Sequence, residues 1–483
     1  MKRSMITVLA LLLCVGLMGC GILPGFLRKE GKTKPEQKPS TEQQTTKPDA
    51  DAQTGNEEPE DAETDTEIAH PELIGNWQWV CETSYSGTPG FSLDEMDHYF
   101  NMADEIGGMD LWIYEEDGSL YADYENSRYE SYERAYHLPI EFTKEPLYEG
   151  CINQEWSAKL IDPRTGDELF CMTIEEGDRL IEYADIVYGE GEDAWRNVEV
   201  DTFLREGSDE LANKDELRYN ETITVSDVND LLRAIDNGKK IILKEGTYDL
   251  SKANERLKNV NVIFNNGWNS ESGTVNDVKI RNVENLCLIA EEGKKVEICI
   301  DSPYDPVLSF DGCRNLVFKG ITAGHHVEPG TCGGSVLQFY DSSKITLNDC
   351  HLYGCGTYGI EATNCSELNV EKSEIYECTY GIVDLTGVYD ASFTDCKMHD
   401  NKDMDMISLS QCGTITFTDC EFRDNQVAAQ QYFSVSFVRA SECYDTALHH
   451  CTFTGNSYSQ FNEGDVEIDN CSFKDTIVSS KED

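Results

Sequence analysis

The chain has 483 residues, of which 91 are acidic and 39 are basic, so its formal net charge at pH 7 is −52. Negative charge on this scale repels nucleic acid and anionic membrane surfaces, and we therefore exclude both as direct binding partners. It also disfavours binding of polyuronates and sulfated glycans unless calcium bridges the two negative surfaces. Calcium is therefore the one candidate cofactor.

The first twenty residues are typical of an exported bacterial protein. Two basic residues precede an apolar run over residues 5–18, which is too short to span a membrane comfortably. The tetrapeptide LMGC at residues 17–20 resembles a bacterial lipobox, and this resemblance implies cleavage before Cys20 and lipidation of that cysteine. We expect residues 1–19 to be a lipoprotein signal peptide and Cys20 to anchor the chain on the outward face of a bacterial cell membrane. A plain secretory signal cleaved nearby is the alternative.

Residues 20–70 form an acidic segment rich in Pro, Gln and Thr with almost nothing to bury, which predicts a disordered tether. A flexible coil of about 50 residues spans on the order of 40 Å on average. Such a tether would hold folded domains away from a membrane or carry them through a cell wall.

Residues 71–207 contain short alternating runs separated by turn sequences such as Asp117-Gly118, which predicts a small antiparallel β-barrel or sandwich. The acidic segment 91–108 could form a short helix that closes one end. The opening GNW at residues 75–77 resembles the start of lipocalin-like barrels, which implies room for a small apolar ligand. We favour the alternative of a packed structural spacer with Trp77 in its core.

The remaining segment, residues 208–483, opens with a helix and a strand. Ser226 is a plausible N-cap, and an apolar stripe at helical spacing follows it between Val228 and Ile235. The strand sequence KIILKEGTYDL comes next. This opening resembles the N-terminal cap and first coil of right-handed parallel β-helix proteins of the pectin-lyase-like class. A solenoid needs such a cap to cover its first rung.

An eleven-residue pattern then recurs six times, at intervals of 20 to 31 residues. Each copy contains apolar residues two positions apart, followed by a residue at one aligned position that we call the column. A further short strand follows most copies. Three short strands per coil, with coils stacked about 4.8 Å apart, predict a parallel β-helix. The column contains Cys350, Ser373, Cys396, Cys420, Cys451 and Cys471.

The repeated positions explain how the solenoid is built, and by themselves they do not indicate a catalytic site. Small, polarisable cysteines pack well where one position meets itself on every rung, so we expect free buried thiols. Cys355 and Cys378 are the pair closest to a candidate disulfide. No zinc-type spacing is expected around His351, because strand alternation directs it away from Cys350. A second column, which predicts an amide ladder, contains Cys355, Cys378, Asn401, Asn425 and Asn456.

The least repetitive part of the solenoid, residues 320–339, is the predicted site of any catalysis, because function is usually carried on loops. His325 or His326 could act as a general base near Glu361 or Asp384 on neighbouring rungs. The alternative is that this segment only shapes a tight excursion of the chain. The resemblance to β-helix proteins covers residues 220–475 as architecture and includes no catalytic motif. Further acids on these rungs are Asp403 and Asp405.

Tyrosines on the solenoid surface are candidates for stacking on sugar rings. The leading hypothesis is a monomeric, lipid-anchored surface protein that binds a carbohydrate or another surface polymer along the solenoid face, with catalysis undecided. One alternative is a polysaccharide lyase or glycoside hydrolase with its site near residues 320–339, and another is a structural or adhesive stalk. The candidate tyrosines are Tyr353, Tyr358, Tyr376, Tyr380 and Tyr389.

Overall fold

The computed structural model describes residues 70–478, with gaps at 94–95, 128–132, 149–150, 167, 176–178, 190–193, 255, 266–276, 303, 329–332, 355 and 429–433. The predicted signal peptide, Cys20 and residues 20–69 of the predicted tether lie outside the described residues, and so does Cys355. In the described part of the chain, no helix is long and apolar enough to cross a membrane.

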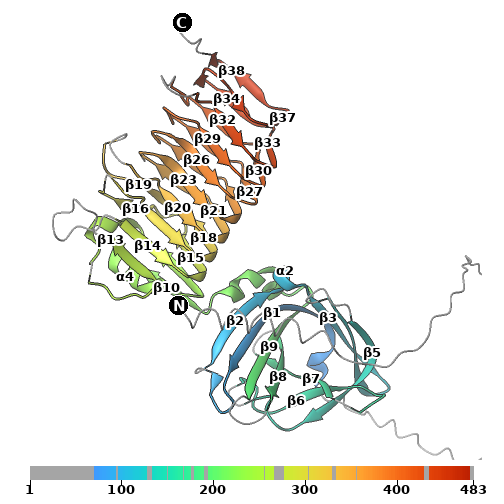
Figure 1. The fold of residues 1–483 in the computed structure, drawn as a ribbon. Helices are drawn as coiled ribbons and strands as arrows, with labels where there is room; N and C mark the ends of the chain where they lie inside the picture. The colour runs from blue at the N-terminus through green and yellow to red at the C-terminus, as the bar shows by residue number, and fades with distance from the viewer. Residues whose placement is uncertain are drawn as a thin grey trace, which may run out of the picture. The chain divides into compact units, whose positions relative to one another are not determined.

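The first folded region is a closed antiparallel barrel, drawn in blue and green in Figure 1. From the third strand to the last, the strands follow the chain in a meander. The first strand pairs with both the second and the third, and its pairing with the last strand closes the sheet. A short helix, α2 (Ala103–Ile106), lies within the predicted helical segment, but residues 97–102 before it form a strand. The strands are β1 (Gly75–Gly87), β2 (Asp97–Met102), β3 (Met109–Glu116), β4 (Ser119–Asn126), β5 (Glu133–Thr143), β6 (Ser157–Ile161), β7 (Glu168–Glu175), β8 (Arg179–Tyr188) and β9 (Trp195–Arg205).

Side chains fill the barrel interior. Trp77 is buried, and its indole N–H donates to the carbonyl oxygen of Leu73 at 2.9 Å. A cavity among Met109, Leu160 and Phe203 has a volume of about 10 Å³, enough for about one water molecule. Trp77 therefore lies in the core of the barrel, as predicted.

The second folded region is a solenoid of three sheets, which Figure 1 shows as stacked arrows from β10 to β38. Neighbouring strands within each sheet are parallel, except for the antiparallel pair β13–β14 at the start of the third sheet. Sheet 1 consists of β10 (Glu221–Val225), β11 (Lys239–Leu243), β15 (Glu284–Ala290), β18 (Arg314–Lys319), β21 (Ser343–Asn348), β24 (Ser366–Glu371), β27 (Ala391–Thr394), β30 (Thr414–Thr418), β33 (Asp445–His449) and β37 (Glu467–Asp469).

Sheets 2 and 3 complete each coil. Sheet 2 consists of β12 (Gly246–Asp249), β16 (Val296–Ile300), β19 (Thr322–His325), β22 (His351–Tyr353), β25 (Glu374–Tyr376), β28 (Lys397–His399), β31 (Glu421–Arg423), β34 (Thr452–Thr454) and β38 (Ser472–Lys474). Sheet 3 consists of β13 (Val262–Asn265), β14 (Asp277–Arg281), β17 (Leu308–Asp311), β20 (Leu337–Tyr340), β23 (Tyr358–Thr363), β26 (Gly381–Thr386), β29 (Ile407–Ser410), β32 (Val438–Ser441) and β36 (Asn462–Glu463). A last small sheet pairs β35 (Ser457–Tyr458) with β39 (Ile477–Val478).

Two short helices, α3 (Asp209–Ala212) and α4 (Val228–Ala234), precede the regular coils. The N-cap of α4 is Asp227 and not Ser226, because the Asp227 carboxylate accepts hydrogen bonds from the backbone N–H groups of Asn229 and Asp230 at 2.8 and 3.0 Å. The buried face of α4 packs against the solenoid core, as expected for a cap. The 3₁₀ turns of the described chain are Pro71–Leu73, Lys214–Arg218 and Leu250–Lys252.

The solenoid core is built from columns of like residues. Phe393 and Phe417 stack with ring centroids 4.5 Å apart on successive rungs of sheet 1. The predicted cysteine column is also inside: four of its cysteines are buried and the fifth, Cys471, is half-buried. All described cysteines, including Cys378, are free thiols, as the periodic placement predicts.

The predicted asparagine column forms a buried amide ladder. The Nδ2 of Asn401 donates to Oδ1 of Asn425 at 3.0 Å, and the Nδ2 of Asn425 donates to Oδ1 of Asn456 at 3.0 Å. Each amide also donates to the backbone carbonyl of the middle residue of a sheet 2 strand one rung earlier. The ladder therefore satisfies backbone groups at the turn where each coil leaves this sheet.

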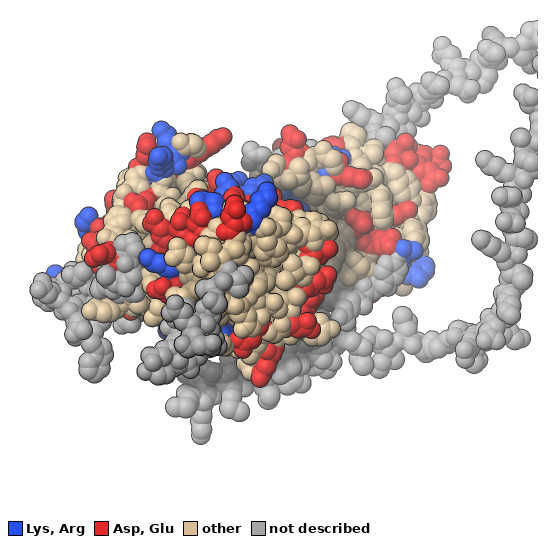
Figure 2. Space-filling view, turned by 90° about the horizontal axis from the view of Figure 1, so that it is seen from above, with Lys and Arg blue, Asp and Glu red and all other residues tan. Residues whose placement is uncertain are grey.

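The surface carries the acidic excess of the sequence. Figure 2 shows Asp and Glu side chains spread over the visible face, with fewer Lys and Arg side chains among them. Acidic groups are therefore distributed over the surface and do not gather in a single patch on this face.

Candidate functional site

The outer face of sheet 2 carries a connected set of polar and aromatic side chains. Strands β22, β25 and β28 each have three residues, of which the middle one is buried. The two flanking residues therefore point outward on every rung. In register, the outward residues of these three strands are His351 and Tyr353, Glu374 and Tyr376, and Lys397 and His399.

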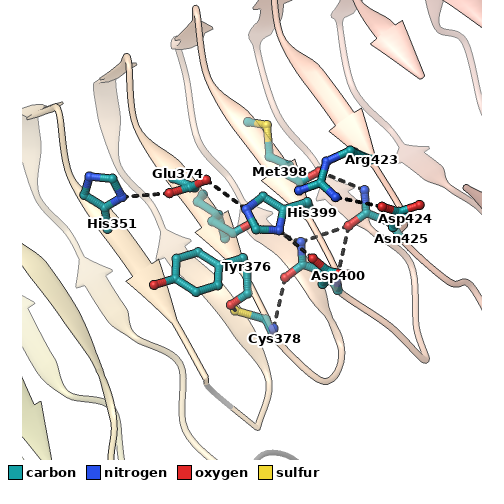
Figure 3. Close-up of polar contacts among 12 residues, drawn as sticks. His351, Glu374, Tyr376, Cys378, Met398, His399, Asp400, Arg423, Asp424 and Asn425 are labelled. Carbon is teal, nitrogen blue, oxygen red and sulfur yellow. Dashed lines mark hydrogen bonds and ion pairs between the residues drawn. The ribbon is translucent and has the colours of Figure 1, made fainter. Parts of the chain in front are cut away.

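A chain of hydrogen bonds joins three of these rungs (Figure 3). One carboxylate oxygen of Glu374 lies 2.8 Å from Nδ1 of His351, and the other lies 2.9 Å from Nε2 of His399. The Nδ1 of His399 lies 2.7 Å from a carboxylate oxygen of Asp400. Each group fixes the orientation of the next, so this chain is pre-organised.

Two opposing effects set the pKa of Glu374. Partial burial raises it, but the hydrogen bonds from His399 and His351 and the charges of these rings lower it by more, so the pKa lies below its ordinary value. Glu374 is therefore ionised at neutral pH and accepts hydrogen bonds on both oxygens.

Aromatic rings form a second column beside this chain. Tyr353 stacks on Tyr376 with centroids 5.8 Å apart, and Tyr376 stacks on His399 with centroids 5.1 Å apart. The ring of Tyr353 also lies over Gly324, where an added Cβ would come within 2.4 Å of it. Because these rings cover one another's faces along the solenoid axis, they present mainly their edges to solvent.

The hydroxyl group of Tyr353 extends the network to an earlier rung. It donates to Oε1 of Glu297 at 2.5 Å, and His326 Nε2 lies 3.2 Å from the same oxygen. Burial and this carboxylate raise the pKa of Tyr353, so the hydroxyl keeps its proton and acts as a donor.

A groove of about 680 Å³ lies over this part of sheet 2. Its lining includes His351, Tyr376 and Glu297 together with the basic residues Lys294 and Lys295. A second groove of about 720 Å³ lies over sheet 1 and shares Lys294, Gly320 and Asp349 with the first. Because they share these residues, the two grooves adjoin each other at the corner between sheets 1 and 2. Both acidic and basic side chains line this corner.

The predicted catalytic histidines lie at the end of β19 in sheet 2. His325 is buried with 2% of its surface exposed, and its Nε2 donates to the backbone carbonyl oxygen of Asp305 at 2.9 Å. Burial lowers the pKa of His325, so its ring is neutral at pH 7. These contacts favour a structural role for His325 at the corner of the coil. The side chain of His326 is 37% exposed.

The predicted acids Glu361 and Asp384 lie in sheet 3 on β23 and β26, paired in register on successive rungs. Glu361 accepts hydrogen bonds from Gln338 and Thr357 at 2.9 and 2.8 Å. Burial, with smaller contributions from Glu361 and Asp405, raises the pKa of Asp384. The structure thus brings the two acids together. No hydrogen bond or ion pair joins either one to His325 or His326 within the described chain.

The five predicted tyrosines fall into separate groups. Tyr353 and Tyr376 belong to the column on sheet 2. Tyr358 is 8% exposed and contacts Tyr380, 40% exposed, in an edge-on arrangement at the entry to sheet 3. Tyr389, 71% exposed, lies in the turn between β26 of sheet 3 and β27 of sheet 1. These five residues therefore do not form one continuous stacking surface.

Sequence reasoning missed Glu374, His399 and Glu297 as members of this face. A signal was present: the repeat that places Tyr376 outward also places Glu374 outward two residues earlier. The same repeat places Glu374 one rung after His351 at the equivalent outward position.

Residues 261–436 and 335–479 match the family model described as "Right handed beta helix region". The solenoid is a right-handed parallel β-helix. The fold class predicted from the sequence is therefore confirmed, as is the antiparallel barrel that precedes it.

Several solved structures are similar to this chain at low identity. A pectate lyase from Paenibacillus sp. 0602 shares 8% identity, with 54% of this chain and 79% of that chain covered and a TM-score of 0.37. Pectate lyase Pel9A shares 13% identity over 52% and 69% of the two chains, with a TM-score of 0.35. The Streptococcus pneumoniae surface protein and adhesin PfbA shares 12% identity over 50% and 75%, with a TM-score of 0.28. Similarity at this level assigns no activity. No curated protein matches the chain.

Proposed function

We propose that the protein is anchored by lipid on Cys20 to the outward face of a bacterial membrane, and that its β-helix binds a neutral carbohydrate polymer over sheet 2. The observation that carries the binding proposal is the hydrogen-bonded chain of His351, Glu374 and His399 beside the groove of about 680 Å³. The lipobox-like sequence before Cys20 supports the anchor.

Sugars present many hydroxyl groups that both donate and accept hydrogen bonds. The carboxylate of Glu374, the imidazoles of His351 and His399 and the edge of Tyr376 offer matching groups in fixed orientations (Figure 3). Fixed side chains lose little entropy when a ligand binds. Because the outward positions recur on successive rungs, an extended polymer could meet similar positions repeatedly along the solenoid.

The charge balance favours a neutral polymer over an acidic one. The net charge of the whole chain is −52, and Glu297 and Glu374 lie on this face. The basic residues Lys294 and Lys295 lie in the same groove and can donate to sugar hydroxyls or ring oxygens. An acidic polymer would have to overcome repulsion from the surrounding carboxylates.

The test is direct binding of the purified full chain to a panel of neutral and acidic glycans, with and without calcium. We expect a neutral glycan to bind and His351→Ala to weaken that binding at least tenfold. Tyr389→Ala is the matched control, because Tyr389 is exposed and lies on no strand of sheet 2. Equal binding by wild type and His351→Ala would contradict the proposed site. Absence of binding to every glycan would favour a stalk.

A second candidate function, glycan cleavage, is supported by the carboxyl pair in sheet 3. Asp384 has a raised pKa, and Glu361 is its partner one rung away. Glycoside hydrolysis uses a pair of carboxyl groups that flank the scissile bond, and a carboxyl group with a raised pKa suits the role of general acid. Mass spectrometry of glycans incubated with the protein tests this candidate. Shortened products that disappear with Asp384→Asn would support it, and intact glycans would argue against it.

A further inference from the structure

Three potential metal ligands of different types converge on the outer face of sheet 2. Single donor atoms of Glu297, Cys299 and His326 all lie within 4.8 Å of one another. Glu297 and Cys299 come from strand β16, and His326 follows β19 on the next rung. The carboxylate and the imidazole Nε2 are already 3.2 Å apart.

Cys299 differs from the cysteines of the inward column. In β16 it is paired in register with Asp249 on β12 and Gly324 on β19, which continue the outward column that contains Tyr353. Packing of the core therefore does not explain a thiol at this position. It is nevertheless buried, and His326 stands on the side of the cluster that faces solvent.

Neighbouring hydrogen bonds orient Glu297, and a second carboxylate lies near His326. Oε2 of Glu297 accepts from Thr247 at 3.2 Å, and Oε1 accepts from the hydroxyl of Tyr353 at 2.5 Å. Nδ1 of His326 faces a carboxylate oxygen of Asp301 at 4.0 Å, while Nε2 faces Glu297. The 4.0 Å separation is too long for a hydrogen bond, so Asp301 places negative charge near His326 without fixing its ring.

We propose that Glu297, Cys299 and His326 form a zinc-binding site. A thiolate and an imidazole select zinc over calcium or magnesium, which prefer oxygen ligands. Zinc–ligand distances of about 2.0–2.3 Å bring tetrahedral ligand atoms to about 3.5 Å from one another, so a pair of donors 4.8 Å apart would need to close by about 1.3 Å. The exposed side of His326 provides the entry path, and water completes the fourth position.

Glu297 also lines the groove proposed for carbohydrate, but the test of the zinc site needs no glycan. The full chain is stripped of metal with a chelator, and Zn²⁺ affinity is measured by calorimetry. Co²⁺ is used as a spectroscopic substitute that reports thiolate ligation by a charge-transfer absorption band. We expect the wild-type protein to bind zinc at one tight site and to show the cobalt–thiolate band. Cys299→Ser should lose that band and bind zinc at least tenfold more weakly.

Cys287→Ser is the matched control, because Cys287 is a buried thiol on β15 of sheet 1. It should leave both affinity and spectrum unchanged. His326→Gln changes a partly exposed residue, so the circular dichroism spectrum should stay unchanged while zinc binding weakens at least tenfold. This variant provides the test if Cys299→Ser does not fold. Zinc affinity that is unchanged in His326→Gln, or a cobalt–thiolate band that survives Cys299→Ser, would overturn the proposal.

Discussion

Replacing Asn425 with alanine should destabilise the β-helix strongly, because its buried side chain makes four hydrogen bonds. Oδ1 accepts from the backbone N–H and the Nδ2 of Asn401 at 3.1 and 3.0 Å. Nδ2 donates to the carbonyl oxygen of Met398 at 2.9 Å and to Oδ1 of Asn456 at 3.0 Å. At about 1 kcal/mol net per bond, the free energy of unfolding should fall by about 4 kcal/mol.

Denaturant unfolding followed by circular dichroism measures this loss. Five of the six tryptophans belong to the barrel region, so tryptophan fluorescence reports mainly on that region and should keep its midpoint. Asn348→Ala is the control, because Asn348 makes a single exposed side-chain bond to Glu371 at 3.1 Å and should cost less than about 0.5 kcal/mol. A loss below about 1 kcal/mol for Asn425→Ala, or equal losses for both variants, would refute the ladder as a source of stability.

Three further outcomes follow from the structure. Gly324→Ala should displace the ring of Tyr353, since the new Cβ would lie 2.4 Å from it, and should weaken glycan binding at least threefold in a direct binding assay; unchanged affinity would contradict the role of this ring. Asp384→Asn should raise the free energy of unfolding at pH 8 but not at pH 3. The raised pKa of Asp384 means that ionisation is disfavoured in the folded state, and the penalty appears only as pH rises above the ordinary Asp value; urea unfolding at both pH values checks this, and an equal effect at both would contradict it. Cys20→Ala should abolish incorporation of a labelled fatty acid in a bacterial host, whereas labelling that persists would rule out this lipidation site.

The sequence was sufficient to predict the β-helix, because a column residue that recurs on each rung is visible as a period of about 23 residues. The cysteine and asparagine columns could be located for the same reason. The N-cap was misplaced by one residue, because Ser226 and Asp227 are both good caps and only the backbone at Asp227 places a side-chain oxygen within reach of two N–H groups.

The candidate site was harder to predict, because it depends on which sheet each residue joins. Glu361 and His326 are only 35 positions apart along the chain, yet Glu361 lies on a strand of sheet 3 and His326 directly follows a strand of sheet 2. Conversely, Glu297 and Tyr353 are 56 positions apart and form a hydrogen bond of 2.5 Å. The sequence repeat predicts on which coil of the solenoid a residue lies. A contact between two coils also depends on the length and direction of each side chain, which the repeat does not predict.

The most direct test of the proposed binding face is hydrogen exchange of the full chain with and without a bound neutral glycan. The account predicts slower exchange in peptides that contain β22, β25 and β28, with little change in peptides confined to β23 and β26. Protection confined to β23 and β26 would place the ligand on sheet 3, and unchanged exchange throughout the β-helix would contradict polymer binding along the solenoid.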